Sequence, residues 1–366
     1  MTTREMGHAR LLLISQDQFG YLTDSFQYCT YLRNHFQITF VGWDYELPRI
    51  TLEGVECMHI SRDGGKLRRY YVFLRQVMQI LRQRPAEIVY VEYFPLCALL
   101  PLFGGKRSRT VLDIRTGYVR NSILMRVLSN GLMTLETLFF RHVMVISDSL
   151  RRFLCISKKK ARILPLGADE CACEPKEFSS LRLFYVGSLD YRHIDETVNG
   201  LVLFIRRHPE APVESYDIVG FGSEEEEERL RQAIRNVPAG PRVVFHGRRM
   251  STELTPFLER SNVGVAFIPA KKHYQCQPAT KVFEYLLAGM VVIATHTYEN
   301  ARVINETNGV LTDDSARGFC HGLENLLERR NTYDSAQIRS NIGGYAWNRI
   351  VAENLLPFLT ALLRKP

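Results

Sequence analysis

The sequence predicts an α/β protein with two parallel sheets, and three observations carry this prediction. Short apolar segments rich in β-branched residues alternate with helical patterns in both halves of the chain, as in βαβ units. A polar stretch at 168–180, which includes Pro175, separates the two halves. The length of 366 residues suits two domains at roughly 100–200 residues each. We therefore expect two domains of comparable size, joined once in the middle.

Ten strands and one long amphipathic helix follow from the pattern. The helix spans 67–83. The strands are expected at 10–15, 38–42, 88–92, 110–114, 143–147, 181–187, 215–220, 243–246, 263–268 and 291–295.

A last apolar segment, 345–363, has helical spacing from Trp347 to Leu362, and Pro357 should kink or divide it. Because the second sheet is complete before this helix, we expect the helix to pack on the first domain. The predicted boundaries are 1–168, 169–345 and 346–366.

Composition narrows the class of protein. Hydrophobic residues make up 46% and charged residues 23%, which excludes a disordered chain or a collagen-like fibre. The apolar runs are too short to span a bilayer, and the polar start at 1–10 does not resemble a secretory signal. The eight cysteines lack any Cys-x-x-Cys spacing. These features predict a cytoplasmic protein with reduced thiols.

The charge is unevenly distributed. Residues 1–168 contain 24 basic and 13 acidic residues, whereas 169–366 contain 23 and 26. A basic first half favours an anionic partner such as anionic lipid or a phosphate-bearing acceptor. Nucleic acid is not expected, because no motif of a nucleic-acid-binding module is present.

The most informative motif is Pro278-Ala-Thr-Lys-Val-Phe-Glu-Tyr-Leu-Leu-Ala-Gly-Met-Val-Val-Ile-Ala-Thr295. Thr280 is a plausible N-cap for a helix over 281–287 that Gly289 ends. Free backbone N–H groups at the helix start, together with Lys281, suit a diphosphate. Glu284, one turn further, could accept both hydroxyls of a ribose. The alternative is a surface helix with an ordinary Lys–Glu pair.

This segment resembles the nucleotide-binding signature of retaining glycosyltransferases of the GT-B fold, group 1 (GT4). Further similar segments follow in the family's order: Arg162-Ile-Leu-Pro-Leu-Gly-Ala-Asp169, Phe184-Tyr-Val-Gly-Ser-Leu189, Ile218-Val-Gly-Phe-Gly222, Val244-Phe-His-Gly247 and Asn308-Gly309-Val-Leu311. The resemblance implies two Rossmann-like domains facing a cleft. The second would bind a nucleoside-diphosphate sugar and the first an acceptor, without a metal or other cofactor.

The resemblance also assigns roles to residues of the second domain. Gly187 would let the backbone approach the phosphates, Glu284 would hold the ribose, and Arg192 with Lys281 would neutralise the leaving diphosphate. The family usually has Arg after this glycine, where this chain has Ser188. Eight residues before Glu284 the family has a second Glu, where this chain has Cys276. The implied donor-binding set is Gly187, Ser188, Arg192, Gln277, Thr280, Lys281 and Glu284.

In the first domain, the strand at 110–114 ends in Asp113 and is followed by Arg115. Relatives carry polar residues here, so Asp113 is predicted to contact the acceptor hydroxyl and Arg115 an acceptor charge. The catalytic set is therefore Asp113, Arg115, Arg192 and Lys281. The alternative is that Asp113 only caps the loop. The loop with Gln16, Asp17 and Gly20 would form the acceptor side, and Glu92 and Tyr93 follow another strand in the same way.

A membrane contact is a further hypothesis. The segment 119–140 is rich in Leu, Met and Phe and carries Arg120 and Arg126, with Arg141 next to it. Core helices would explain this composition, but a basic, apolar helix could also rest on an anionic membrane and suit a lipid-linked acceptor. Lys158-Lys-Lys160 is either a solvated turn or a headgroup contact.

The sequence thus predicts a retaining glycosyltransferase of polysaccharide or glycolipid synthesis, cytoplasmic or peripheral at the inner membrane face. Its expected partners are a nucleotide sugar and a lipid-linked or saccharide acceptor. Two alternatives remain open at this point: a nucleotide-sugar epimerase of the same architecture, and a non-catalytic partner subunit.

Overall fold

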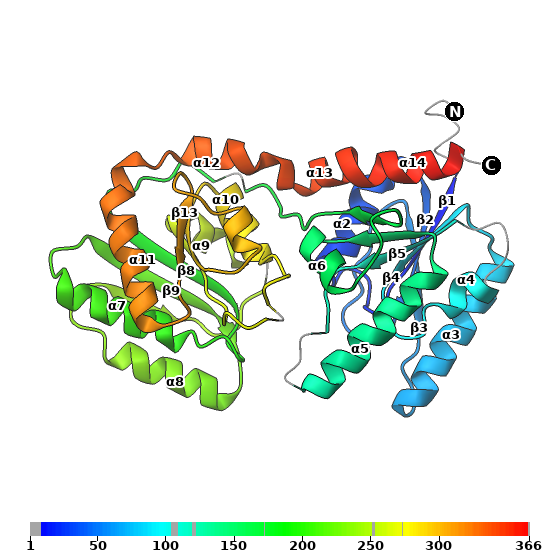
Figure 1. Cartoon of the computed structure of the whole chain (residues 1–366), viewed down its shortest axis with the longest axis horizontal. Coiled ribbons are helices and arrows are strands. Elements are labelled where there is room, and N and C mark those ends of the chain that lie inside the picture. Colours follow the sequence, from blue (N-terminus) through cyan, green and yellow to red (C-terminus); the bar gives the residue numbers. More distant parts are fainter. Residues whose placement is uncertain are drawn as a thin grey trace. The chain divides into compact units, whose positions relative to one another are not determined.

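A computed structural model describes residues 9–103, 109–118, 122–171, 173–250, 253–272 and 274–364. The chain forms two compact units, Met1–Leu166 with Trp347–Pro366, and Gly167–Ala346. Each unit contains one parallel sheet, of seven and six strands respectively, with helices packed on it (Figure 1). The predicted architecture of two Rossmann-like parallel-sheet domains is confirmed.

The first sheet has the order β3-β2-β1-β4-β5-β6-β7. Its central strands are buried on both faces: in β1, Leu11 to Ile14 are at most 2% exposed, which explains the uninterrupted apolar run. The strands are β1 Arg10–Ile14, β2 Gln37–Trp43, β3 Val55–Ile60, β4 Ile88–Glu92, β5 Arg109–Ile114, β6 His142–Val145 and β7 Ala161–Ile163. The helices are α2 Thr23–Leu32, α3 Lys66–Gln83, α4 Leu99–Phe103, α5 Ile123–Glu136 and α6 Asp148–Phe153, and the 3-10 helix Thr137–Phe139 follows α5.

The C-terminal segment belongs to the first unit. It consists of α13 Trp347–Ile350, one π-helical turn at Val351–Leu355 and α14 Leu356–Arg364. The predicted division at Pro357 is confirmed: Pro357 has no N–H to donate, and the wider turn just before it accommodates its ring. Trp347 is 1% exposed and meets the ring of Tyr28 at 5.9 Å.

The second sheet has the order β10-β9-β8-β11-β12-β13. Helix α7 packs against α8 and α11, whereas α10 packs against β11, β12 and α12 (Figure 1). The strands are β8 Leu181–Ser188, β9 Val213–Phe221, β10 Arg242–Phe245, β11 Val263–Ala266, β12 Val291–Thr295 and β13 Gly309–Thr312. The helices are α7 Asp195–Arg207, α8 Glu224–Arg235, α9 Thr255–Arg260, α10 Thr280–Leu287, α11 Ala316–Arg329 and α12 Ser335–Ile342.

All ten predicted strands are present, with ends that differ by up to two residues, and three further strands were missed. Strand β3 is partly exposed along most of its length and mixes polar with apolar residues. Strand β7 has only three residues, and β13 begins at Gly309, where Asn308-Gly309 reads as a turn. The missed strands lie at the sheet edges, where one-sided pairing leaves a weak apolar signal.

The expectation that all thiols are reduced is wrong for one pair. Cys171 and Cys173 form a disulfide in the segment that leads into β8, and their Cα atoms are 5.2 Å apart. This separation lies within the usual range for a disulfide. Cysteines two residues apart can therefore form a disulfide, a spacing that a search for Cys-x-x-Cys does not detect.

Candidate functional site

The sheet order of the second unit indicates where a ligand can bind. Consecutive strands run outward in one direction from β8 to β10, and in the other from β11 to β13. The loops that follow β8 and β11 therefore diverge at the carboxyl ends of neighbouring strands, which is where open α/β sheets bind ligands. These loops span 189–194 and 267–279.

Gly187 and Lys281 come together at this edge. A Cβ atom on Gly187 would lie 2.7 Å from Lys281 Nζ, and φ of Gly187 is +149°, a conformation that favours glycine. The ammonium group also lies 4.1 Å from the centroid of the Tyr185 ring, within cation–π distance. The missing side chain at Gly187 thus makes room for the lysine of α10.

Lys281 has a strongly altered proton affinity. Burial and, to a smaller extent, the nearby positive charge of Arg192 lower the pKa of Lys281 to about 7, although Glu284 opposes both effects. A cation that loses its charge this easily lacks a sufficient anionic partner in the free protein. The local electrostatics therefore favour the arrival of an anion.

Arg192 supplies the second positive charge from the loop after β8. Its guanidinium carbon lies 4.7 Å from the centroid of the Tyr274 ring, and its Nη1 is buried with no hydrogen-bond partner among the described residues. The flanking residues Tyr191 and His193 have φ of +59° and +54°. Such conformations are costly for residues other than glycine and concentrate at functional sites.

Ser188 and the start of the same loop are fixed by hydrogen bonds. Ser188 Oγ accepts from the Asp190 N–H at 3.2 Å, and the Ser188 carbonyl accepts from the Tyr185 hydroxyl at 2.6 Å. Asp190 Oδ1 in turn accepts from the Ser223 N–H at 2.7 Å. Ser188 therefore orders the loop that carries Arg192.

Helix α10 begins one residue earlier than predicted. Its N-cap is Ala279, whose side chain makes no capping hydrogen bond, and Thr280 is the first helical residue. The assignment of Thr280 as the N-cap is therefore wrong. The alanine side chain at the cap cannot accept from the first backbone N–H groups of this helix, and the Val282 N–H donates to the Ala279 carbonyl at 2.9 Å.

The end of α10 agrees with the prediction. Gly289 has φ of +75°, and the Gly289 and Met290 N–H groups donate to the Leu286 and Tyr285 carbonyls at 3.0 Å each. This is the Schellman pattern of a helix that ends on glycine. Ser335 at the start of α12 donates to the Gly289 carbonyl at 2.9 Å, which fixes this end of the helix.

Glu284 is half-buried one turn after Lys281. Burial raises the pKa of Glu284, the charge of Lys281 opposes this shift, and Asp169 adds to it. Asp169, at the start of the segment that enters the second unit, was not predicted as a site residue. Its only sequence signal was its place in the Arg162–Asp169 motif.

The loop before α10 contains the predicted glutamines. The Gln277 N–H donates to the Tyr274 carbonyl at 3.2 Å, which folds the loop, and Gln275 Oε1 accepts from the Tyr298 N–H at 2.8 Å. Cys276, at the position of the family's second Glu, is half-buried and is not part of the disulfide. The Tyr274 ring beside Arg192 is a contact that sequence reasoning missed, because nothing in the spacing relates the two residues.

The first unit has a reversal of its own, between β1 and β4. Gln16, Asp17 and Gly20 lie in the loop after β1, where Gly20 has φ of +87° and Gln16 Nε2 is buried with no partner among the described residues. Gln18, which was not predicted, anchors this loop: its Oε1 accepts from the Tyr45 N–H at 2.8 Å.

Glu92 ends β4 at the same edge. Burial raises the pKa of Glu92 to about 8, a hydrogen bond with Ser15 opposes this, and the carboxylates of Asp113, Asp17 and Asp24 add to it. Glu92 Oε2 is buried and, within the described chain, has no hydrogen-bond partner.

Asp113 and Arg115 lie inside the first unit. Asp113 is 1% exposed, and burial raises its pKa to about 6 although Arg115 opposes this. Arg115 Nε donates to Asp24 of α2 at 2.6 Å and Nη1 donates to the Leu164 carbonyl at 3.0 Å. This arrangement favours the structural alternative for Asp113, and it joins Arg115 to α2 and to the segment after β7.

Helix α5 exposes an apolar surface. We use the term α5 surface for Ile123, Leu124, Val127, Leu128, Leu135, Leu138 and Phe139, which are 46–71% exposed. Lys160 adjoins it, since its Nζ donates to the Leu138 carbonyl at 3.0 Å, and Lys158, Lys159 and Arg141 are exposed nearby in the chain. Arg120 and the start of the predicted segment 119–140 lie outside the described residues.

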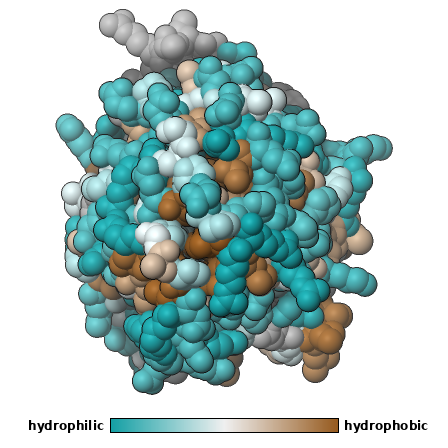
Figure 2. Space-filling model, turned by 90° about the vertical axis from the view of Figure 1, so that its left-hand side faces the viewer, coloured by the Kyte–Doolittle hydropathy of each residue, from teal (hydrophilic) through white to brown (hydrophobic). Residues whose placement is uncertain are grey.

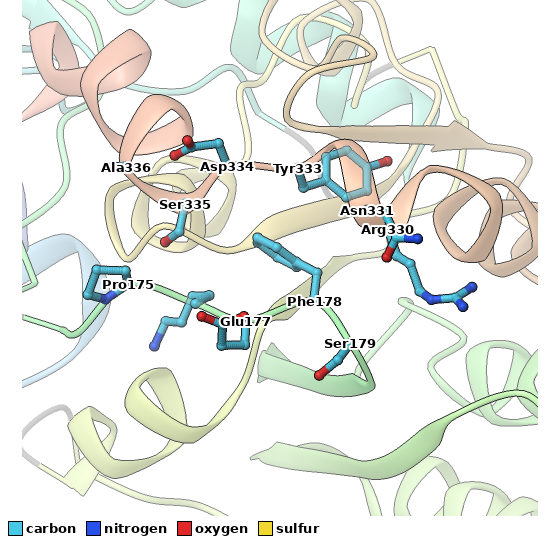
Figure 3. Close-up of a pocket in the computed structure, with 11 residues that line it drawn as sticks. Pro175, Glu177, Phe178, Ser179, Arg330, Asn331, Tyr333, Asp334, Ser335 and Ala336 are labelled. Atoms are coloured by element: carbon cyan, nitrogen blue, oxygen red, sulfur yellow. The ribbon is translucent and has the colours of Figure 1, made fainter.

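Figure 2 shows one face of the molecule, on which hydrophilic side chains predominate and apolar ones gather in smaller areas between them. A cavity of about 420 Å³ lies between the segment before β8 and the α11–α12 connection, where the Phe178 and Tyr333 rings meet edge to face with their centroids 5.7 Å apart (Figure 3). Because this segment precedes β8, the cavity lies at the amino ends of the strands, away from Lys281. No three His, Cys, Asp or Glu side chains in the described ranges are grouped to hold a metal ion.

Residues 180–329 match the model of the family described as Glycosyl transferases group 1. The matched region makes up most of the second unit, and this part of the chain is therefore similar to a group 1 glycosyl transferase domain. The matched residues include Gly187, Arg192, Lys281 and Glu284, and the prediction of a glycosyltransferase enzyme is confirmed. No curated protein matches the sequence.

Solved structures similar to this glycosyltransferase share its GT-B fold over nearly the whole chain. Sucrose-phosphate synthase from Thermosynechococcus elongatus is 16% identical, with a TM-score of 0.74 over 96% of this chain and 99% of its own. Anabaena HepE in complex with UDP and glucose is 12% identical, with a TM-score of 0.73 over 97% and 100%. An α,α-trehalose-phosphate synthase (UDP-forming) from Burkholderia vietnamiensis is 13% identical, with a TM-score of 0.67 over 97% and 99%. Among the described residues, no helix has the length and apolarity to cross a membrane.

Proposed function

We propose that this glycosyltransferase transfers a sugar from a nucleoside-diphosphate sugar, bound by the second unit, to an acceptor hydroxyl with retention of configuration. One observation carries the proposal: Lys281 packs against Gly187 beside Arg192, at the uncapped start of α10. Two cations and the start of a helix at a strand-end switch point suit a diphosphate. HepE, a similar structure, is a complex with UDP and glucose, which supports this ligand class.

In this proposal, different residues of the donor site have different roles in sugar transfer. As the glycosidic bond breaks, negative charge develops on the leaving diphosphate, and Lys281, Arg192 and the α10 N–H groups stabilise it. Arg192 can engage two phosphate oxygens, whereas Lys281 acts as a point charge that becomes fully protonated when the anion binds. Glu284 accepts from the ribose hydroxyls, and Ser188, Thr280 and Gln277 line the donor.

The acceptor belongs to the first unit in this proposal. Gln16, Asp17 and Gly20 follow β1 at the reversal of the sheet, which supports them as the acceptor side. Asp113 and Arg115 would act as positioning residues, because their buried network joins β5 to α2. No metal or other cofactor is expected in the reaction.

We further propose a lipid-linked acceptor at an anionic membrane surface. An exposed apolar area of this kind on one helix indicates a binding surface. Between Asp113 and Asp148 the sequence has a single acidic residue, Glu136, and that residue is 2% exposed. The α5 surface is therefore apolar and basic, which suits anionic lipid. Co-sedimentation with phosphatidylglycerol vesicles that high salt abolishes would support this; no binding would refute it.

A thermal-shift panel of nucleoside diphosphates tests the donor site and identifies the base. The expected result is stabilisation by one nucleotide, weakened in Lys281→Ala and Glu284→Ala but kept in Lys271→Ala, an exposed lysine of the same loop region. Loss of transfer in the first two variants with an intact fold is expected. Near-normal binding and activity in both would refute the assignment.

Two assays on the purified protein distinguish a transferase from an epimerase and from a non-catalytic subunit. An epimerase would convert a nucleotide sugar without any acceptor, and a non-catalytic subunit would bind no nucleotide in calorimetry. Release of nucleoside diphosphate only in the presence of acceptor is the outcome expected for the transferase.

A further inference from the structure

A tight turn directly after β4 contains an unusual residue. The Cys97 N–H donates to the Phe94 carbonyl at 3.1 Å, Pro95 occupies the second position, and Leu96 the third with φ of +69°. This is the pattern of a type II turn, whose third position favours glycine or asparagine. A leucine there is disfavoured by contact between its Cβ and the backbone.

Burial does not compensate for this conformation. The Leu96 side chain is 47% exposed. An exposed apolar side chain in a left-handed conformation stabilises the fold neither locally nor through packing. Sequences that break a local rule without a structural benefit do so mostly at functional positions.

A buried carboxylate holds the turn in place. Glu136, at the end of α5, accepts from the Tyr93 hydroxyl at 3.0 Å and from the Ala98 N–H at 3.3 Å, and the Leu96 N–H also donates to it. These contacts attach the residues on both sides of Leu96 to α5. Leu135, the neighbour of Glu136 in the chain, belongs to the α5 surface, so the turn is joined to the helix that carries that surface.

The location of the turn is the second observation. It follows Glu92 at the strand-end reversal of the first unit, where the acceptor side is proposed. The turn with the exposed Leu96 therefore follows a strand end on the acceptor side and is also joined to α5.

We infer that Leu96 contacts the hydrocarbon part of a membrane-bound acceptor, and that Glu136 is the positioning residue that holds Leu96 in place. The inference rests on the proposed membrane-surface function. We take the occupant to be lipid because the exposed charged residues that follow the α5 surface, Arg141, Lys158 and Lys159, are basic. The carboxylate of Glu136 does not offset them, because it is buried and accepts hydrogen bonds from the turn.

An environment-sensitive fluorophore at single cysteines tests the contact. Leu96→Cys, Leu128→Cys on the α5 surface, and Glu46→Cys as a matched control are labelled in a Cys155→Ser background. Cys155 is the exposed one of the free cysteines in the described chain, and Glu46 is an exposed residue that also has positive φ. Labelled Cys155→Ser alone gives the background.

With phosphatidylglycerol vesicles, we expect a blue shift and quenching by brominated lipid at positions 96 and 128, but not at 46. A response at 128 without one at 96 overturns the inference and leaves the proposed membrane surface standing. The absence of a fluorescence response at both 96 and 128 refutes the proposed membrane surface, and this inference with it.

The role of Glu136 has its own readout. In Glu136→Ala, and in the milder Tyr93→Phe, the response at 96 should weaken while that at 128 is unchanged. An undiminished response at 96 in both variants would overturn the positioning role. Tyr93→Phe, which removes only a hydroxyl, keeps the test valid if Glu136→Ala does not fold.

Discussion

Binding of the donor should be accompanied by proton uptake at Lys281. Its pKa of about 7 in the free protein arises from burial and the charge of Arg192. A diphosphate beside it restores the charged form, so the pKa rises towards its ordinary value near 10.4. At pH 8 about 0.9 proton per donor should be taken up, at pH 7 about half, and at pH 6 about 0.1.

The same shift weakens binding at high pH. If only the charged lysine binds the donor, the dissociation constant of the donor rises about 50-fold between pH 7 and pH 9. Each tenfold rise corresponds to a loss of about 1.4 kcal/mol of binding free energy. Calorimetry in two buffers of different ionisation enthalpy measures the uptake directly. A nucleotide sugar is the suitable ligand, because its diphosphate does not titrate near neutral pH.

Two variants control this experiment. Lys281→Met keeps the length of the side chain without the charge, so uptake should vanish. Arg192→Gln removes a positive neighbour, so the pKa of Lys281 should rise and uptake at pH 8 should fall. A binding enthalpy that is independent of buffer at pH 8, or an uptake that grows towards pH 6, would refute the electrostatic reasoning.

Three further predictions concern stability, each measured by urea unfolding. The pKa of Glu92 is raised to about 8 in the folded protein, so between its unfolded and folded pKa values the folded state binds more protons than the unfolded state. The contribution of the protonated carboxyl group to the free energy of unfolding is therefore lost as pH rises through 8. Wild type should therefore lose more stability than Glu92→Gln between pH 5 and about 8.5; equal losses would contradict this. Leu359→Ala, at a site 0% exposed in α14, should cost about 2–4 kcal/mol, and a cost below about 1 kcal/mol would argue against the packing of this helix. Leu96→Gly should leave stability unchanged or raise it by up to about 1 kcal/mol, because glycine removes the left-handed penalty; a clear loss would show that Leu96 serves the fold.

The sequence predicted the central strands and the helix with Lys281 and Glu284 because these carry strong local signals. An uninterrupted apolar run identifies a buried parallel strand, and glycine at a helix end identifies where the helix stops. Edge strands such as β7 lack these signals, since three residues hold too little pattern for an assignment.

Contacts between distant segments could not be predicted. The packing of Lys281 on Gly187, or of Arg192 on Tyr274, depends on how strands β8 and β11 become neighbours. Asp113 shows the reverse problem: a polar residue at a strand end suggests a site, but its burial against α2 depends on the whole unit. Leu96 gave a weak local signal, because Pro95 favours a turn but does not determine its type.

The fixed end of α10 has a consequence for how this site can vary. Gly289 and Ser335 hold the last turn, so the direction of each side chain on the helix is set by counting back from residue 289. One inserted residue would rotate Lys281 by about 100° about the helix axis and shift it by about 1.5 Å. Exchanges of residue type at 281 and 284 alter the strength of ligand contacts, whereas a change in the number of residues before the glycine misdirects both charges at once. Natural variants of this segment should therefore differ in composition and keep its length.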